Sequence, residues 1–520
     1  MSNLSPGVYV NEIASGVRPI AGVSTSTTAF IGRFERGTVD KAIRITSWGQ
    51  FEKTYGGLHL DSATSYAVNQ YFLNGGSIAY IIRVVGGTGV KSSLIINDDS
   101  TTQAIELNAS SEGKWGDNIY VGIGAKDANK YDLLVREYDG NTVVNEEVFL
   151  DLDRRITQPR FINRIVNPTS KIVTAVGTAS KLPEATQIGS SDASLNDLLG
   201  LNKSGLSRLK NGSNGTSTAA DRQAALKGQQ STRSGIYALE DITPDTFNLM
   251  CIPECSDLTA LGAKDVYEVA EKFCSDHFAF LLVDPDNSDA ENIYSNRFDA
   301  SLGGAASKNS AAYYPRLTFP DPLNPGSTRK IGPSGMMAGQ IAKTDANRGV
   351  WKAPAGTETR FSGGDPEFLL TDLQAGPLNS LGVNCLRSLP VFGNICMGAR
   401  TLVGSDALGS EWKYVPVRRT ALYIEASLKR GLQWALFEGN DERLWGDLRL
   451  NVNAFMQGLF RKGAFQGSSA KDAYLVKCDA DTTTQADIDL GIVNILVGFA
   501  PLKPAEFIFL NIKQLTKLAT

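Results

Sequence analysis

Hydrophobic residues in the first part of the chain alternate between strand-like runs and one helical face. Residues 27–34 (TTAFIGRF), 41–48 (KAIRITSW) and 77–85 (SIAYIIRVV) are rich in β-branched and aromatic residues, which predicts three strands. Between the last two, Asp61 can cap a helix whose apolar face is Ala63, Tyr66, Ala67 and Tyr71. This β-β-α-β pattern predicts the first part of an α/β core over residues 22–90.

The pattern changes after residue 90. Residues 91–235 contain short polar strands, and two of them flank Asp139-Gly140-Asn141, which is typical of a β-hairpin turn. The stretch NGSNGTST, residues 211–218, has the composition of a linker. We therefore expect residues 91–235 to form an inserted, mainly β surface domain.

The α/β pattern returns in residues 236–500. A strand at 248–254, a helix at 258–277 and a buried strand at 277–287 come first, and Pro- and Gly-rich loops are expected at 315–335. A helix at 335–345 and paired strands at 383–402 follow. Apolar residues at helical spacing then predict a hairpin of two helices over 417–460, broken at Gly439-Asn440, and two further strands at 472–479 and 491–500. The expected domains are 1–21 (N-terminal arm), 22–90 and 236–500 (core), 91–235 (insertion) and 501–520 (C-terminal arm).

Composition and charge exclude several classes of protein. Hydrophobic residues make up 42% of the 520 residues and charged residues 20%, as in folded globular proteins. The net charge of -4 argues against a nucleic-acid-binding protein, which would carry a basic excess. The longest strictly apolar run, Phe278–Val283, is far shorter than the roughly 20 residues of a membrane span. The opening MSNLSPGVYV lacks the features of a secretory signal, so we expect synthesis in the cytoplasm and no membrane insertion.

Common catalytic motifs are missing from the chain. HExxH, GxSxG, GxxxxGK[ST] and GxGxxG do not occur, and His59 and His277 are the only histidines. The six cysteines form no CxxC pair and are expected to be buried free thiols. The sequence therefore predicts no catalytic, cofactor-binding or metal-binding residues and a protein that is not an enzyme.

Three clusters leave other interpretations open. Residues 87–92 (GTGVKS) loosely resemble a phosphate-binding loop, but the glycine and the lysine are not adjacent. Cys251, Cys255 and Cys274 precede His277 without the spacing of zinc ligands. Asp284 and Asp286 follow a buried strand, where α/β folds place ligand sites, and an enzyme that holds a metal there is one alternative. An Asp-Pro turn explains these two carboxylates equally well.

Both ends of the chain are strand-prone and set apart from the core by Pro or Gly. The N-terminal candidate strand contains Val8, Tyr9, Val10 and Ile13, and the C-terminal one contains Phe507, Ile508, Phe509, Leu510 and Ile512. A lone strand is marginal in water, and an exposed strand edge recruits another chain. Such ends can add strands to neighbouring copies. The alternative is that they pack on their own core or fray.

Five stretches of the sequence resemble tail sheath proteins of contractile bacteriophages and of phage-tail-like contractile injection systems. They are LSPGVYVNEIASGVRPIAGVSTSTTAFIGRFERG, TSWGQFEKTYGG followed by NGGSIAYIIRV, PSGMMAGQIAKTDANRGVWKAPAG, the run 414–467 that begins YVPVRRTALYIEASLKRG, and the closing GFAPLKPAEFIFLNIKQ. The resemblance covers residues 4–90 and 245–514 and does not cover the insertion, residues 91–235. The segment GVNCLRSLPVFGNICMGARTL is more apolar than this family leads us to expect.

The resemblance implies a structural function. In such a sheath, six subunits form a ring, rings stack helically around an inner tube, and terminal arms complete a small sheet in neighbouring subunits. Contraction drives the tube through a target envelope without nucleotide hydrolysis. The implied partners are the chain itself, the inner tube protein, and baseplate and tail terminator proteins, with no direct contact to nucleic acid. The implied location is a phage tail or tail-like particle made in the bacterial cytoplasm. A non-contractile, strand-exchanging shell or filament is the alternative.

Four basic residues on the first helix of the predicted hairpin are candidates for contact with the tube. Arg418, Arg419, Lys429 and Arg430 would give this helix a basic side. By analogy with the family, this side would meet an acidic tube surface. A solvated helix face with local ion pairs is the alternative interpretation.

Overall fold

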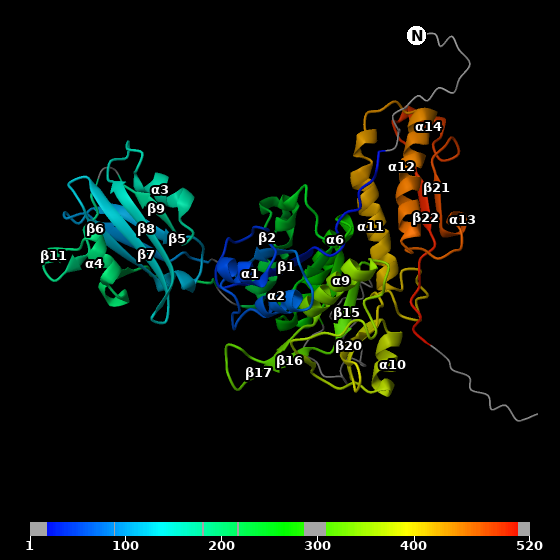
Figure 1. Ribbon diagram of the computed structural model, residues 1–520, viewed down its shortest axis with the longest axis horizontal. Helices are drawn as coiled ribbons and strands as arrows, with labels where there is room; N and C mark the ends of the chain where they lie inside the picture. Colours follow the sequence, from blue (N-terminus) through cyan, green and yellow to red (C-terminus); the bar gives the residue numbers. More distant parts are fainter. Residues whose placement is uncertain (1–17, 88, 179–180, 216–217, 285–307, 508–520) are drawn as a thin grey trace, which may run out of the picture. The chain divides into compact units, whose positions relative to one another are not determined.

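The computed structural model describes residues 18–87, 89–178, 181–215, 218–284 and 308–507. These residues divide into two compact units (Figure 1). Unit 1 contains the described residues up to Thr25, Thr344–Ala353 and those from Glu411 onward, and unit 2 contains Ser26–Lys343 and Pro354–Ser410. The α/β fold class predicted from the sequence is confirmed, since helices alternate with the strands of a mainly parallel sheet.

Unit 2 is built on an eight-stranded sheet in the order β2-β3-β1-β13-β14-β15-β19-β20. The six central strands are parallel, and β2 and β20 pair antiparallel at the two edges. The chain runs from β1 to β3 on one side and later to β13 on the other side, as in a doubly wound fold. The strands are β1 (Thr28–Gly32), β2 (Ile43–Ile45), β3 (Ala79–Arg83), β13 (Leu249–Cys251), β14 (Phe280–Val283), β15 (Ser310–Tyr314), β19 (Val383–Leu389) and β20 (Gly393–Met397).

Helices cover both faces of this sheet, which is why β1, β3, β13 and β14 are buried along their whole length. Helix α6 (Ala260–Asp276) contributes Val266, Ala270 and Phe273 to the core on one face. Helices α2 (Ala63–Leu73) and α9 (Ser334–Arg348) belong to the other face. There α9 approaches α2 so closely that a Cβ atom on Gly335 would lie 2.2 Å from the Ala67 carbonyl oxygen.

Some local predictions for unit 2 are wrong. Ser62, and not Asp61, caps α2, because its hydroxyl accepts a hydrogen bond from the Ser65 amide at 3.0 Å. The predicted strand 41–48 is shorter, since helix α1 (Trp48–Tyr55) begins at its end. The expected loops at 315–335 contain a β-hairpin, whose short strands are separated by prolines. The remaining elements here are β16 (Leu317–Pro320), β17 (Thr328–Ile331), β18 (Asp365–Pro366) and α10 (Asp372–Ser380).

The inserted segment has three antiparallel sheets, in the orders β12-β6-β7-β8, β4-β5-β9 and β10-β11. The two larger sheets and α3 contribute to one hydrophobic cluster of their own. The predicted hairpin at Asp139-Gly140-Asn141 is confirmed, since Asp139 of β7 pairs with Thr142 of β8. The elements are β4 (Ser93–Asn97), β5 (Gln103–Ala109), β6 (Ile119–Ala125), β7 (Lys130–Asp139), β8 (Thr142–Asp153), α3 (Ile162–Thr169), β9 (Val173–Gly177), β10 (Gln187–Ile188), β11 (Ser191–Asp192), α4 (Leu195–Gly200) and β12 (Ser207–Arg208). Helix α5 (Ala219–Lys227) packs instead on α6 of the core, where Lys227 pairs with Asp265 at 2.7 Å.

Unit 1 is organised around the predicted helical hairpin, which is confirmed as α11 (Val415–Gly431) and α12 (Glu442–Arg461). Beside it lies a two-stranded antiparallel sheet of β21 (Tyr474–Lys477) and β22 (Leu496–Phe499), with the short helices α13 (Ala470–Ala473) and α14 (Gln485–Asp489) (Figure 1). Residues 18–25 and 344–353 pack with this hairpin. This grouping differs from the predicted continuous core segment 236–500, because it depends on contacts between residues hundreds of positions apart.

Candidate functional site

The N-terminal segment of unit 1 runs along the helical hairpin toward its loop. The Val23 amide donates a hydrogen bond to Ser427 Oγ at 3.2 Å, and the Arg18 amide donates to Asn451 Oδ1 at 2.6 Å. The Arg18 guanidinium lies 4.4 Å from the centre of the Trp434 ring. The first described residue therefore sits at the end of the hairpin where α11 stops and the chain turns toward α12.

The C-terminal segment is anchored at the other end of α11. The Gln466 amide donates to the Ala500 carbonyl at 2.9 Å, and Tyr414, the residue before α11, donates its hydroxyl to Glu506 Oε2 at 3.3 Å. Helix α11 has 17 residues, so it is about 25 Å long at 1.5 Å per residue. The two terminal segments thus leave the hairpin near opposite ends of a helix of about this length.

The small sheet of unit 1 has two free edges within the described part of the chain. Strands β21 and β22 pair only with each other there. Tyr474, Val476, Val497 and Phe499 face the hairpin core, whereas Leu475 and Leu496 on the outer face are more than half exposed. A two-stranded sheet is marginal by itself. Its free edges are suited to accepting additional strands.

Most of the predicted arm residues lie outside the described residues. These are Val8, Tyr9, Val10, Ile13, Ile508, Phe509, Leu510 and Ile512. Phe507, the last described residue, is exposed. The participation of all nine residues in inter-subunit strands stays a prediction.

The predicted basic side of α11 is wrong for two of its four residues. The Arg419 side chain is 3% exposed, and its guanidinium pairs with the 2% exposed Asp345 at 2.6 Å and donates to the Thr25 carbonyl at 2.8 Å. Arg418 is also buried, 3.3 Å from Glu425 and stacked on Trp412, and burial lowers its pKa. Local spacing along α11 does not reveal Asp345, which is far away in the sequence. Lys429 and Arg430 are exposed, and their contact with a tube stays a prediction.

Arg419 holds the three segments of unit 1 together. Its guanidinium donates to Asp345 Oδ1 at 2.9 Å and to Asp345 Oδ2 at 2.6 Å, so the pair is bidentate. One side chain of the hairpin therefore binds both the segment 344–353 and the end of the N-terminal segment. No sequence motif distinguishes this residue from the exposed Lys429 and Arg430 of the same helix.

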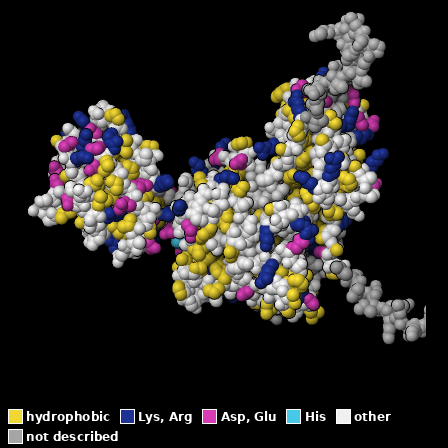
Figure 2. Space-filling model, in the orientation of Figure 1, with side chains coloured by type: hydrophobic (Ala, Val, Ile, Leu, Met, Phe, Trp, Pro, Cys, Tyr) yellow, Lys and Arg dark blue, Asp and Glu magenta, His cyan; other side chains and the backbone are white. Residues whose placement is uncertain are grey.

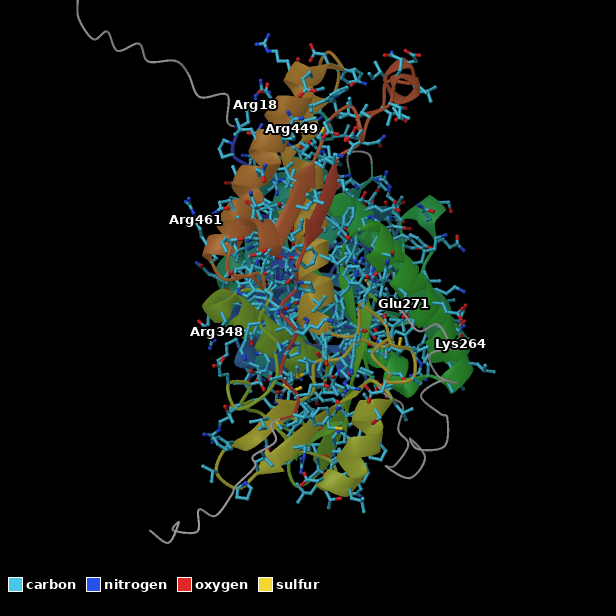
Figure 3. The ribbon with its side chains drawn as sticks, turned by 90° about the vertical axis from the view of Figure 1, so that its right-hand side faces the viewer. Arg18, Lys264, Glu271, Arg348, Arg449 and Arg461 are labelled. Carbon is cyan, nitrogen blue, oxygen red and sulfur yellow. The ribbon has the colours of Figure 1, made fainter. Side chains whose placement is uncertain are left out.

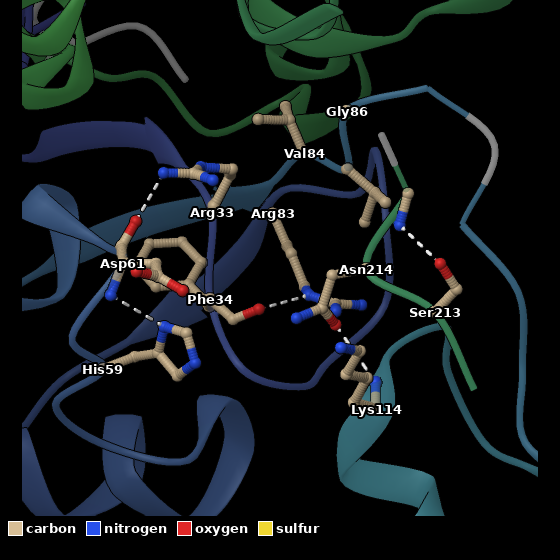
Figure 4. Close-up of a pocket in the computed structure, with 12 residues that line it drawn as sticks. Arg33, Phe34, His59, Asp61, Arg83, Val84, Gly86, Lys114, Ser213 and Asn214 are labelled. Carbon is tan, nitrogen blue, oxygen red and sulfur yellow. Dashed lines mark hydrogen bonds between the residues drawn. The ribbon is translucent and has the colours of Figure 1, made fainter. Parts of the chain in front are cut away.

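Unit 2 has a pocket of about 310 Å³ beyond the carboxyl ends of β1 and β3 (Figure 4). Ligands of doubly wound folds bind in this region. Here, however, Arg33 pairs with the buried Glu254 at 2.9 Å, and Arg83 donates to the carbonyls of Phe34, Gly37 and Glu112 at 2.8–2.9 Å. Two of the cations that line the pocket are thus already bound to the protein.

The histidine at this pocket is neutral at physiological pH. Burial lowers the pKa of His59, and its Nδ1 accepts a hydrogen bond from the Asp61 amide at 3.3 Å. Among the described residues that line the pocket there is no cysteine and one serine, Ser213. The Ser213 amide and carbonyl pair with Val90, and Figure 4 shows Ser213 on the opposite side of the pocket from His59. The residues that line this pocket thus connect loops of the core with loops of the insertion. Among these described residues, none is paired with His59 for acid–base catalysis.

Asp284 caps a helix. Its carboxylate accepts hydrogen bonds from the amide and the hydroxyl of Ser334, at 2.8 and 2.5 Å, where α9 begins. Burial raises the pKa of Asp284 to about 7. Asp286 lies outside the described residues. Within the described ranges, no three or more His, Cys, Asp or Glu side chains are grouped so that they could hold a metal ion.

The six cysteines are free and buried, as predicted. Burial raises the pKa of Cys251, Cys255 and Cys274, which keeps these thiols protonated. Among the described helices, none is both long enough and apolar enough to cross a bilayer.

Comparison with known proteins shows that the helical hairpin and the small sheet are similar to parts of tail sheath proteins. Residues 409–514 match the phage tail sheath C-terminal domain, which is the part of unit 1 that contains the hairpin and the small sheet. A prophage major tail sheath protein of Pseudomonas aeruginosa is 29% identical over 185 residues, or 35% of this chain. The aligned region spans 45% of that relative's length.

Solved structures show the same fold over nearly the whole chain. A sheath subunit from the contracted PVC extracellular contractile injection system is 21% identical with a TM-score of 0.57, covering 99% of this chain and 98% of that one. The sheath tail protein of Listeria innocua is 14% identical with a TM-score of 0.59, covering 93% and 96%. These homologues are structural sheath proteins and not enzymes, which agrees with the expectation from the sequence. Residues 409–514 thus match the phage tail sheath C-terminal domain, and the fold of the chain is similar to that of sheath proteins from contractile injection systems, as the resemblance in the sequence predicts.

Proposed function

We propose that this chain is the structural subunit of a contractile tail sheath, which polymerises as stacked hexameric rings around an inner tube. One observation carries the proposal: the segment that matches the sheath C-terminal domain contains a two-stranded sheet whose two edges are unpaired within the described part of the chain. Sheets of this size need further strands for stability. The chain's own strand-prone ends, offered by neighbouring copies, would supply them.

The two arms are long enough to reach different neighbours. At about 3.3 Å per extended residue, the 17 residues before Arg18 span at most about 56 Å and the 13 residues after Phe507 at most about 43 Å. They start near opposite ends of α11. Donor and acceptor surfaces therefore differ, and a contact between unlike surfaces generates rings or open helices.

Contraction fits this arrangement because strands linked between subunits let each subunit rotate as a rigid body without dissociating. Related sheaths have been solved in a contracted state. An extended sheath that is metastable would release free energy in the stroke without a nucleotide. Baseplate and tail terminator proteins would cap the two ends of a particle made in the bacterial cytoplasm. The chain itself would contact neither nucleic acid nor membrane.

The inner tube is the remaining partner. Lys429 and Arg430 are exposed on the last turn of α11 and would face an acidic tube surface. The variant Lys429→Glu/Arg430→Glu should weaken co-assembly with the tube, and the wild-type contact should weaken as salt rises. Lys264→Glu, on α6 of unit 2 (Figure 3), is the matched control. Unchanged co-assembly of the double variant would exclude this contact.

Electron microscopy of the chain, expressed alone and together with its tube protein, tests the whole proposal. Striated hollow tubes, with a slimmer form around the inner tube, are the expected result. Polymers of a single diameter in both preparations would favour a non-contractile shell or filament. A monodisperse small particle in both would refute an assembly function.

A further inference from the structure

The N-terminal segment, residues 18–25, fits closely against the helical hairpin of unit 1. Two glycines permit this fit: a Cβ atom on Gly431 of α11 would lie 2.5 Å from the Ile20 side chain, and one on Gly22 would lie 2.0 Å from the Tyr423 hydroxyl. Distances this short exclude a side chain on either glycine unless its neighbour moves. The hairpin therefore holds this segment along a defined path, which ends at Arg18 within the described chain.

Two side-chain donors remain unpaired where this path ends. Asn451 is 1% exposed and its Oδ1 accepts from the Arg18 amide, but within the described ranges its Nδ2 has no hydrogen-bond partner. The buried Nε1 of Trp434, whose ring lies under the Arg18 guanidinium, has no partner among these residues either. Buried polar groups of native proteins are nearly always hydrogen-bonded, because an unpaired donor loses its water without compensation. Two such donors beside one residue point to acceptors that the described residues do not provide.

Charge does not select the partner of these donors. Figure 2 shows both basic and acidic side chains on the visible face at this end of the hairpin. Several of them pair with each other, since Arg449 lies 2.8 Å from Glu442 and Lys477 lies 2.7 Å from Asp481. The two unpaired donors are neutral N–H groups, which suit the neutral carbonyl oxygens of a polypeptide backbone.

The backbone at and before Arg18 can supply such oxygens. Pro19 follows Arg18, and a residue that precedes proline favours an extended backbone. In an extended chain, the N–H and C=O groups of every second residue point to the same side. The Arg18 amide faces Asn451, so the carbonyls of Arg18 and Gly16 would also face the hairpin if the chain continues as a strand.

We propose that Trp434 and Asn451 bind the backbone of the N-terminal arm at residues 16–18 and thereby fix the direction in which the arm leaves its own subunit. In the polymer, a neighbouring copy would hold the far part of the arm, so the near part would be drawn straight and its carbonyls would meet the two donors. These hydrogen bonds would stabilise the polymer and not the isolated subunit. A fixed direction would guide the arm to one neighbour. This inference rests on the proposed self-assembly and specifies how one arm is guided.

Two matched tryptophan variants of the full chain test this contact. Trp434→Phe keeps a ring under Arg18 and removes the unpaired Nε1–H, so urea unfolding of the isolated subunit should be unchanged. The concentration for half-assembly, measured by sedimentation of polymers, should rise about three- to tenfold. Trp445→Phe is the control, because Trp445 Nε1 already donates to Asn440 Oδ1 at 2.9 Å. The control should unfold at a lower urea concentration and, once folded, assemble at the wild-type concentration.

A map of the wild-type polymer by cryo-electron microscopy gives a second, direct readout. Backbone carbonyls of residues 16–18 about 3 Å from both donors are the expected result. An ordered water or a side chain of another protein at either donor would overturn the inference. Assembly of Trp434→Phe at the wild-type concentration would also overturn it, as would an isolated Trp434→Phe subunit that is as destabilised as the control. Failure of the wild-type chain to polymerise would instead refute the proposed function, and this contact with it.

Discussion

Breaking the buried ion pair of unit 1 should reveal how much this pair holds the unit's three segments together. Arg419 and Asp345 have side chains that are 3% and 2% exposed, so neither charge is solvated once its partner is removed. Removing one member of a buried pair costs about 3–5 kcal/mol, because the other charge stays in a medium of low polarity. We expect Asp345→Asn and Arg419→Met each to lower the free energy of unfolding of unit 1 by about this amount.

The hydrogen bonds of Arg419 support the same loss of unfolding free energy. Arg419 donates to both Asp345 carboxylate oxygens and to the Thr25 carbonyl, at 2.6–2.9 Å. A hydrogen bond to a charged group contributes about 1.5–3 kcal/mol. Arg419→Met leaves three acceptors without this donor, whereas Asp345→Asn keeps one acceptor oxygen and loses the charge. Arg419→Met should therefore be the more destabilising variant.

The double variant Arg419→Met/Asp345→Leu should be markedly more stable than the sum of the single effects predicts. Two apolar side chains of similar size leave no buried charge, and such replacements are often close to neutral. Urea unfolding followed by tryptophan fluorescence suits this cycle, since four of the six tryptophans (Trp351, Trp412, Trp434 and Trp445) belong to unit 1. A loss of unfolding free energy below about 1 kcal/mol in each single variant would refute the reasoning. A double variant whose loss equals the sum of the two single losses would refute it as well.

Three further outcomes are expected in unit 2 and in the chain as a whole. Burial raises the folded pKa of Asp284 from 3.8 to about 7. The free energy of unfolding should therefore be greatest below pH 4 and should fall by at most roughly 4 kcal/mol as the pH rises through 7. Asp284→Asn should flatten this pH dependence in urea titrations from pH 4 to 8, and an unchanged profile would contradict the prediction. Gly335→Ala should cost about 1–3 kcal/mol, because its Cβ would lie 2.2 Å from the Ala67 carbonyl oxygen. Gly458→Ala in α12, where the new Cβ would have open space around it, should be neutral or stabilising. Equal melting temperatures of the two variants would disprove the close contact. All six cysteines should resist a soluble thiol reagent until urea unfolds the chain, and fast labelling of the native protein would show that they are accessible.

Hydrophobic periodicity predicted the regular elements of this protein well. The parallel strands around Phe30 and Leu281 and the hairpin helices around Ile424 and Val452 follow from local apolar spacing alone. Local signals also explain one error, the cap of α2. Ser62 and Asp61 are both good capping residues, and only the backbone geometry selects Ser62.

The candidate functional residues were harder to predict, because they depend on long-range contacts. Arg419 and Lys429 look equivalent along α11, yet only Arg419 meets Asp345, 74 residues away. Trp434 and Asn451 carry no motif, and a buried donor without an acceptor among the described residues is not visible in the sequence. Strand propensity predicts the terminal arms and the resemblance to sheath proteins implies their function, and both stay predictions because most arm residues lie outside the described residues.

The interlaced construction of unit 1 also determines when it can fold during synthesis. The Arg18 amide binds Asn451 across 433 positions, and the Val23 amide binds Ser427 across 404. The ribosome adds about 5–20 residues per second, so these partners emerge tens of seconds apart. Unit 2 can fold on the nascent chain while residues 18–25 wait for the hairpin. If the chain polymerises as proposed, the surfaces of unit 1 that would join one copy to another would form only after the hairpin has been made, which would keep partly made subunits out of a growing polymer.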